Sequence, residues 1–270
     1  MTAARTVGVL SCMLLSTYAG RVTAAPPWVD RPMTLPRLGL ALDAGLGVAH
    51  VLQPSDAGQT GAGLNLEAAF GITRNLEIGL RTGARFGGDG EVTRADAYGR
   101  LFDTETYGTG TDAFANPEFH VRGRLAHLHV VEVGLEGRAY VPFEANTDFG
   151  AMFGVPVAFH FGGVVRLDTG VFVPVIFSQP AQASMSVPAR IWFQPTPRFW
   201  LGPITAVRFH DVPPPYLRRE DASLLVGFGV GYSFGRFADF KADLIFPRVN
   251  DDRAPTRDFG IGVGIGLNFD

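Results

Sequence analysis

The sequence is poor in cysteine, in lysine and in long apolar runs. Of its 270 residues, one is a cysteine, Cys12, and Lys241 is the sole lysine. A single cysteine cannot form a disulfide within the chain, so stability must come from burial or from a membrane. After residue 25, no apolar run approaches the roughly 20 residues that a transmembrane helix needs. Disulfide-rich secreted domains and helical membrane proteins are therefore excluded.

Excess positive charge and the spacings typical of metal or cofactor sites are also missing. The chain has 23 basic and 26 acidic residues. Without Arg5 and Arg21, 21 basic and 26 acidic residues remain, a net charge of −5. This balance argues against a nucleic-acid partner. The sequence contains no Cys/His spacing for zinc, no phosphate-binding glycine loop and no nucleophile elbow. We therefore expect no metal and no cofactor.

The first 25 residues have the pattern of an export signal. Arg5 supplies a positive charge, Val7–Tyr18 forms a short apolar run, and small residues precede Pro26. This order is typical of a secretory signal peptide that is cleaved after Ala24 or Ala25. The run is too short and interrupted for a membrane anchor. We expect a signal peptide at 1–25, a periplasmic N-terminal lead-in at 26–36, and a single outer-membrane barrel domain at 37–270.

The most regular pattern lies at the C-terminus, in residues 258–270. Large apolar residues, from Phe259 to Phe269, occupy every second position, and glycines fill most positions between them. A period of two indicates a β-strand, because successive side chains point to opposite faces of a sheet. A soluble strand usually turns charged residues toward water. An apolar face opposite bare glycine is instead typical of a transmembrane barrel strand.

The same alternation recurs along the chain and gives about twelve strands of about ten residues each. Short turns such as 73–75 and 195–197 alternate with longer loops such as 87–116. Phenylalanines gather near both ends of the strands, as at the two lipid–water boundaries of a barrel. A soluble Greek-key sandwich would not explain why the phenylalanines gather at both ends of the strands. The sequence thus predicts an all-β fold, a closed antiparallel up-and-down transmembrane β-barrel. The strand at 198–210 is apolar on both faces, which leaves its register open.

Residues 71–80, with the sequence GITRNLEIGL, resemble a family of outer-membrane barrels. Its members are labelled meta-pathway phenol degradation proteins, and the resemblance implies transport of small molecules. The shared feature is a strand, a short turn and a returning strand. The final strand also resembles the signal that the barrel-assembly machinery recognises, although Asp270 follows the expected terminal aromatic, Phe269. The expected partners are therefore the outer-membrane lipid bilayer, the barrel-assembly machinery and a small-molecule solute.

The strand pattern directs a balanced set of charged side chains, eight acidic and eight basic with one histidine, toward the lumen. They are Asp43, Glu67, Glu77, Arg81, Arg85, His120, Arg122, Arg124, Glu132, Glu136, Arg138, Arg166, Asp168, Arg190, Asp239, Lys241 and Asp243. These residues would either guide a polar solute or form ion pairs that neutralise each other and stiffen the barrel. The arginines at 81, 85, 122 and 124 lie on neighbouring strands and suggest an anion-attracting patch.

Three functions are compatible with this pattern. The first is a porin-like channel or transporter for small solutes in a Gram-negative outer membrane. The second is a structural or surface-interaction barrel whose lumen is filled by side chains. The third is an outer-membrane lipid hydrolase, which would need a serine and a histidine together on the outer wall. Because no outward serine has the flanking residues of such a site, we assign no catalytic residue and expect no enzyme activity.

Overall fold

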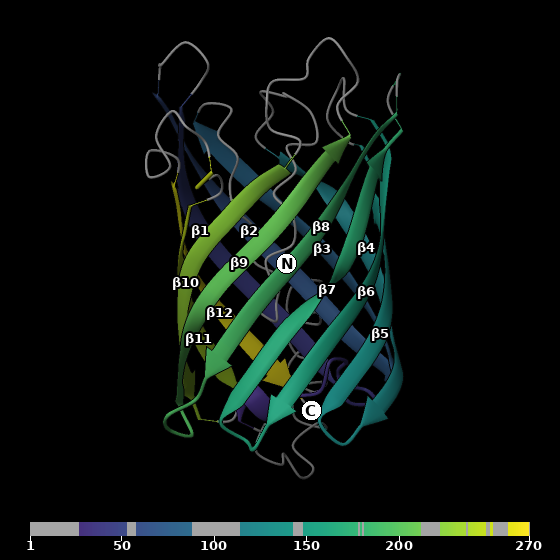
Figure 1. The fold of residues 1–270 in the computed structure, drawn as a ribbon, viewed down its shortest axis with the longest axis vertical. Helices are drawn as coiled ribbons and strands as arrows, with labels where there is room; N and C mark the ends of the chain where they lie inside the picture. Colours follow the sequence, from purple (N-terminus) through teal and green to yellow (C-terminus); the bar gives the residue numbers. More distant parts are fainter. Residues whose placement is uncertain are drawn as a thin grey trace, which may run out of the picture.

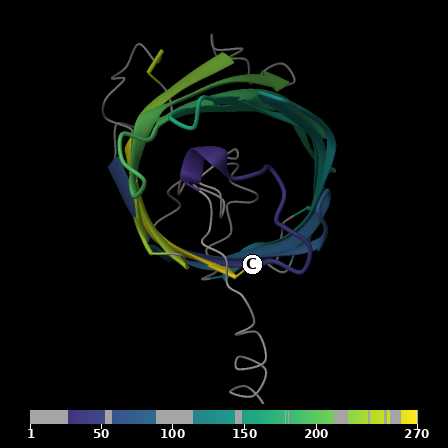
Figure 2. The same cartoon turned by 90° about the horizontal axis from the view of Figure 1, so that it is seen from below.

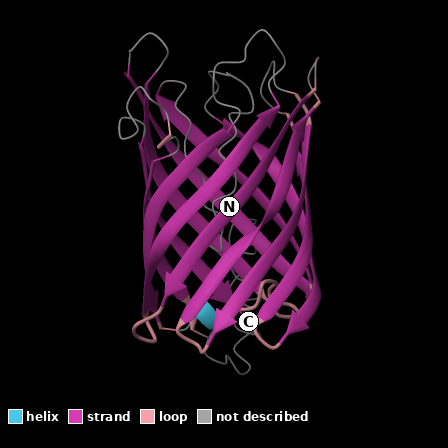
Figure 3. Cartoon of the chain, in the orientation of Figure 1, coloured by secondary structure: helices cyan, strands magenta, loops and turns pink. Residues whose placement is uncertain are grey.

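The computed structural model describes residues 27–52, 58–87, 114–142, 148–177, 179, 181–211, 222–235, 237–246, 249–250 and 259–269. The expected signal peptide lies outside this part of the chain. Twelve antiparallel strands form a closed barrel (Figures 1 and 3). They are β1 (Leu40–Leu52), β2 (Gly58–Thr73), β3 (Leu76–Gly87), β4 (Phe114–Leu128), β5 (Val131–Tyr140), β6 (Gly150–Phe161), β7 (Val165–Ile176), β8 (Gln182–Phe193), β9 (Phe199–Asp211), β10 (Ala222–Phe234), β11 (Ala238–Phe246) and β12 (Phe259–Phe269).

Each strand pairs with its neighbours in the sequence, and β1 closes the barrel by pairing with β12. The closing register is continuous from Leu40 opposite Phe269 to His50 opposite Phe259. Closure leaves the sheet without an open edge, so the backbone of the strands is hydrogen-bonded all the way round. The predicted fold, a closed antiparallel barrel of twelve strands, is confirmed. In the described ranges, no helix has the length and apolar character required to cross a membrane.

The two faces of the strands differ as the alternation predicts. On β12, the side chains of Val263 and Ile265 are 42% and 55% exposed on the outside, whereas Gly260 and Gly266 are buried. Exposed phenylalanines also lie at two levels of the wall, for example Phe161 and Phe234 near the short turns and Phe153 and Phe177 near the opposite ends of their strands. The exterior is therefore an apolar surface with an aromatic belt at each end.

Within the expected lead-in, residues 28–35 extend into the barrel lumen. Seen from below, the helical turn η1 (Trp28–Asp30) lies within the ring of strands (Figure 2). We call residues 28–35 the N-terminal segment. The side chains of Trp28, Val29, Met33 and Leu35 are all buried. The segment turns inward because the lumen supplies both an apolar contact surface and hydrogen-bond acceptors that a free lead-in would lack.

The position of the N-terminal segment also settles the register of the strand at 198–210. Trp200 and Ile204 are buried inside the barrel, whereas Phe199 and Phe209 are exposed on its wall. Trp200 points inward because its ring stacks on that of Trp28. Apolar residues on both faces of β9 therefore have two different partners, the exterior environment on one side and the N-terminal segment on the other.

We predict that Val263→Arg destabilises the folded barrel in a bilayer by about 2–4 kcal/mol, because it would place a charge in the hydrocarbon near the midplane. Urea-dependent folding into lipid vesicles, followed by the mobility shift of unheated samples on gels, measures the effect. Val263→Leu is the matched control and should fold like the wild type. Equal folding of the arginine and leucine variants would contradict the assignment of this face to lipid.

Candidate functional site in the barrel lumen

Side-chain oxygens of the barrel wall accept hydrogen bonds from the backbone of the N-terminal segment. The bonds run from Val29 N–H to Gln194 Oε1 (3.0 Å), from Met33 N–H to Glu132 Oε2 (2.6 Å) and from Leu35 N–H to Glu77 Oε2 (2.9 Å). A buried backbone N–H without a partner is costly, so these acceptors hold the segment in one position. They come from the end of β8, from β5 and from β3, which spreads the anchoring around the ring.

Asp239 on β11 anchors the segment by binding Arg31, the one basic side chain of the segment. Its carboxylate forms an ion pair with Arg31 and accepts hydrogen bonds from Ser233 (2.7 Å) and Asn268 (3.0 Å). On the opposite side, the carbonyl oxygen of Arg31 accepts a hydrogen bond from Arg166 (2.6 Å). Arg31 is thus bound through both its side chain and its backbone.

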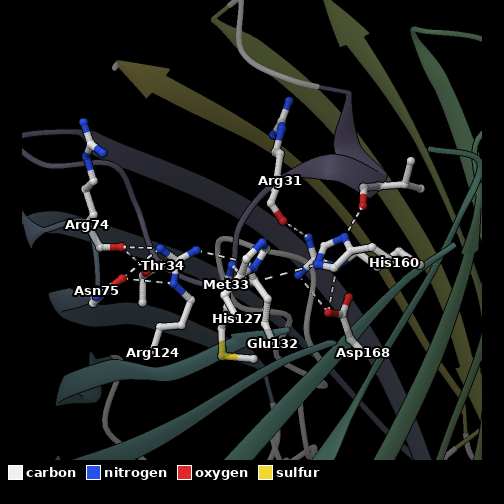
Figure 4. A network of polar contacts seen from close by, with 12 residues as sticks. Arg31, Met33, Thr34, Arg74, Asn75, Arg124, His127, Glu132, His160 and Asp168 are labelled. Carbon is white, nitrogen blue, oxygen red and sulfur yellow. Dashed lines mark hydrogen bonds and ion pairs between the residues drawn. The ribbon is translucent and has the colours of Figure 1, made fainter. Parts of the chain in front are cut away.

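Glu132 is the centre of a second polar cluster (Figure 4). Its Oε1 accepts hydrogen bonds from Arg124 (3.0 Å) and His127 (2.9 Å), while its Oε2 holds the segment at Met33. His160 lies on the other side, with Nε2 4.0 Å from Glu132 Oε2 and Nδ1 2.7 Å from the carbonyl oxygen of Val29. Since a carbonyl can only accept, His160 donates from Nδ1. Strands β4, β5 and β6 therefore meet the segment at this carboxylate.

Three tryptophans, Trp28 of the segment and Trp192 and Trp200 of the wall, pack together inside the barrel. The rings of Trp28 and Trp200 are stacked with centroids 4.8 Å apart, and Trp192 meets Trp28 edge-on at 6.1 Å. Glycines on β10 make this packing feasible. A Cβ on Gly231 would lie 2.1 Å from the ring of Trp200, and one on Gly229 would lie 3.0 Å from that of Trp192. The bare glycine face of β10 is therefore the space that the aromatic rings occupy.

A buried row of ion pairs crosses β3, β4 and β5. Arg122 lies between Glu77 (2.9 Å) and Glu136 (2.7 Å), and Arg138 pairs with Glu136 and Glu118. His120, also buried, has its Nε2 3.4 Å from Glu77 Oε1. Because these groups are almost free of solvent, their mutual pairing offsets the cost of removing the charges from water.

The proposed anion-attracting patch needs correction. Arg122 is neutralised by two carboxylates, and Arg124 bonds to Glu132 and to Asn75. Arg81 is buried in the wall, and the side chain of Arg85 lies outside the described part of the structure. Where the arginines are described, the geometry favours internal ion pairs over an open cationic patch.

A small polar hollow of about 40 Å³ lies inside the wall, against β1, β2, β3, β11 and β12. Asp43 and Lys241 form an ion pair across it at 2.7 Å. The inward-facing residues that line it are Asp43, Gly45, Gly47, Asn65, Glu67, Arg81, Lys241, Asp243, Gly262 and Gly264. The glycines of β1 and β12 give the hollow its width, since larger side chains there would project into it. Five of the lumen residues expected from the sequence meet here.

The remaining lumen candidates lie close to the N-terminal segment. Arg166 pairs with Asp168 at 2.8 Å, and the guanidinium of Arg190 lies 4.8 Å from the centre of the Trp192 ring. Sequence reasoning missed Glu118, although it continues the alternation of His120 and Arg122 on β4. It also missed the anchoring role of Arg31, for which the sequence carries no periodic signal, and that of Gln194, which continues the alternation of Arg190 and Trp192.

Three of the described histidines bond to groups other than serine. His127 contacts Glu132, His160 contacts the carbonyl of Val29, and His50 contacts the hydroxyl of Thr60 at 2.8 Å. These contacts lend no support to the lipid-hydrolase hypothesis.

We predict that Arg122→Met lowers the free energy of unfolding by about 3–5 kcal/mol, because it leaves the carboxylates of Glu77 and Glu136 buried without this cation. Urea unfolding from lipid vesicles measures the loss. Arg198→Met removes an exposed arginine from a turn and should change stability by no more than about 0.5 kcal/mol. Similar losses in the two variants would show that burial of the ion pairs is unimportant.

A further prediction concerns the anchoring of the segment. With residues 1–25 removed, Met33→Cys introduces the only thiol in the chain. Glu132→Ala removes the acceptor of the residue 33 N–H, so this thiol should react with a maleimide several-fold faster in the double variant. Glu118→Ala is the matched control, because it removes another buried carboxylate, one that pairs with Arg138 on β5. Equal acceleration by both substitutions would contradict specific anchoring at Glu132.

Comparisons with solved structures confirm that the chain has the fold of outer-membrane small-molecule channels. The porin NanC has a TM-score of 0.60 at 8% identity, over 84% of this chain and 98% of that chain. An outer-membrane channel from Pseudomonas putida F1 has a TM-score of 0.57 at 10% identity, over 88% and 99%. The KdgM porin, solved in complex with disordered oligogalacturonate, has a TM-score of 0.51 at 7% identity, over 85% and 99%. No family model and no curated protein matches the sequence. These likenesses establish a shared fold.

Proposed function

We propose that this protein is a channel or transporter for small polar solutes in the outer membrane of a Gram-negative cell. The observation that carries the proposal is the contrast between an apolar exterior and a charged interior in one closed barrel. Lipid-facing side chains surround strands whose inward faces carry ion pairs and the polar hollow. A barrel of this kind can lie in hydrocarbon while offering water and polar solutes a path through it.

The outer-membrane location rests on the exterior surface. Large apolar side chains are exposed on many of the strands, a surface far more extensive than the apolar patches of soluble monomers. A closed barrel satisfies its own backbone hydrogen bonds, which is the condition for crossing hydrocarbon. Export by the expected signal peptide at 1–25 would deliver the chain, and β12 would present it to the barrel-assembly machinery.

The proposed path for a solute runs along the lumen beside the N-terminal segment. The segment and the cluster of Trp28, Trp192 and Trp200 narrow the end of the barrel that carries the short turns, whereas the hollow leaves space beside β1 and β12. Balanced ion pairs along the wall favour solutes with several polar groups over apolar ones. The KdgM porin, which shares the fold, was solved with oligogalacturonate, a polar solute.

A filled structural barrel is the second candidate. The observation in its favour is the N-terminal segment itself, whose buried side chains and backbone bonds occupy part of the lumen. A twelve-stranded barrel is intermediate in width between eight-stranded barrels, which side chains can fill, and wide porins with an aqueous channel. The two candidates differ in a single measurable property, the conductance of the folded protein.

We predict that the refolded wild type conducts ions in planar bilayers and that Gly45→Phe lowers the single-channel conductance several-fold. A Cβ at Gly45 meets only the carbonyl oxygen of Val263, at 3.5 Å, which is an ordinary contact, and Gly45 lines the hollow, so a ring attached there would occupy that space. Ala44→Phe is the matched control, because the neighbouring side chain faces outward. A folded wild type without conductance would favour the filled barrel. Equal loss in both variants would exclude the hollow from the path.

A further inference from the structure

We propose that a notch at the short-turn rim of the barrel binds the phosphate headgroup of an anionic phospholipid. The notch is lined by Pro36, Arg37, Ile72, Thr73 and Arg74. It lies between the stretch of chain that precedes β1 and the turn that connects β2 to β3. This inference is independent of whether the lumen conducts.

The turn that carries Arg74 is fixed from the lumen side. Its carbonyl oxygen accepts hydrogen bonds from the hydroxyl of Thr34 (2.9 Å) and from Arg124 Nη2 (3.1 Å). Within the turn, Asn75 N–H donates to Thr73 Oγ1 (3.1 Å). Since the backbone is held inward, the guanidinium of Arg74 points away from this polar network (Figure 4). The arginine is thus displayed on a rigid support.

The turn that carries Arg37 is tied to the same edge of the wall. Leu38 N–H donates to the carbonyl of Gly71 at the end of β2 (2.7 Å), and Gly39 N–H donates to that of Pro36 (2.9 Å). Leu38 has a φ of 65°, a conformation that L-residues with side chains adopt only when the surroundings impose it. The two arginines are therefore presented by two turns that are bonded to the same strand.

The charges in the notch are available to a ligand. Arg37 and Arg74 are both exposed, and neither forms an ion pair with any residue in the described ranges. The five lining residues include no carboxylate. In the lumen, by contrast, Arg122 and Arg124 are bound to glutamates. Guanidinium groups match the oxygens of a phosphate through paired hydrogen bonds, so two unpaired arginines in one notch favour this group.

The surroundings of the notch favour a phospholipid over free phosphate. Leu38 and Ile72 are 50% and 39% exposed, and Ile78 continues the apolar surface along β3. A phospholipid would place its phosphate between the arginines and its acyl chains on this surface. In the proposed topology, the short-turn rim lies at the periplasmic boundary of the membrane, where such headgroups are present. Free phosphate would satisfy the arginines and leave the adjoining apolar surface unused.

Native mass spectrometry of the folded protein in detergent tests the proposal, with phosphatidylglycerol, phosphatidylcholine and inorganic phosphate as probes. The wild type should retain phosphatidylglycerol in preference to phosphatidylcholine. R37Q/R74Q should retain phosphatidylglycerol about tenfold less, because the paired charge-assisted bonds are lost. R198Q is the matched control, since Arg198 is an exposed arginine in the turn between β8 and β9, and it should bind like the wild type.

Each alternative result overturns the proposal. Undiminished lipid retention by R37Q/R74Q would show that the notch is not the site. An equal loss in R198Q would show that any positive charge at the rim suffices. Binding of inorganic phosphate as tight as that of phosphatidylglycerol would assign the notch to free phosphate. The mobility shift of unheated samples confirms folding of each variant, and R37Q and R74Q singly give the same reading if the double variant fails to fold.

Discussion

A carboxylate that is buried in the barrel interior needs a cation or a hydrogen-bond donor, because little water reaches it. Glu77 and Glu132 meet this need from two directions. In both, Oε1 binds an arginine of the wall and Oε2 binds a backbone N–H of the N-terminal segment. The wall arginines hold these carboxylates in place, and the carboxylates hold the segment in place. The same two carboxylates thus pair with the charges of the wall and hold the segment inside the lumen.

The distribution of glycine follows from what lies inside. On β10, glycines leave room for the rings of Trp192 and Trp200, which pack against the segment. On β1 and β12, glycines border the polar hollow, where side chains leave space unfilled. Glycine therefore allows close packing on one side of the barrel and leaves open space on the other. One side accommodates a compact aromatic cluster, and the other preserves the opening on which the proposed channel function depends.

Period-two alternation was sufficient to predict the fold, the strand count and the two faces, because a barrel strand has lipid on one side along its whole length. It also placed Glu77, Arg122 and Glu136 on the interior. It could not predict the N-terminal segment, whose sequence has no period and whose partners lie far along the chain. For the same reason, Trp200 gave an ambiguous register: its partner, Trp28, belongs to a segment expected elsewhere. Interactions that depend on distant residues leave no local pattern.

The position of the segment has a consequence for the order of assembly. Its three backbone bonds reach β3, β5 and the end of β8, and its arginine reaches β11. No single hairpin supplies more than one of these anchors. The residues that are synthesised before the barrel can therefore be seated fully only after strands from both halves have come together. The part of the described chain that is made first therefore cannot reach its final position until strands made much later are in place.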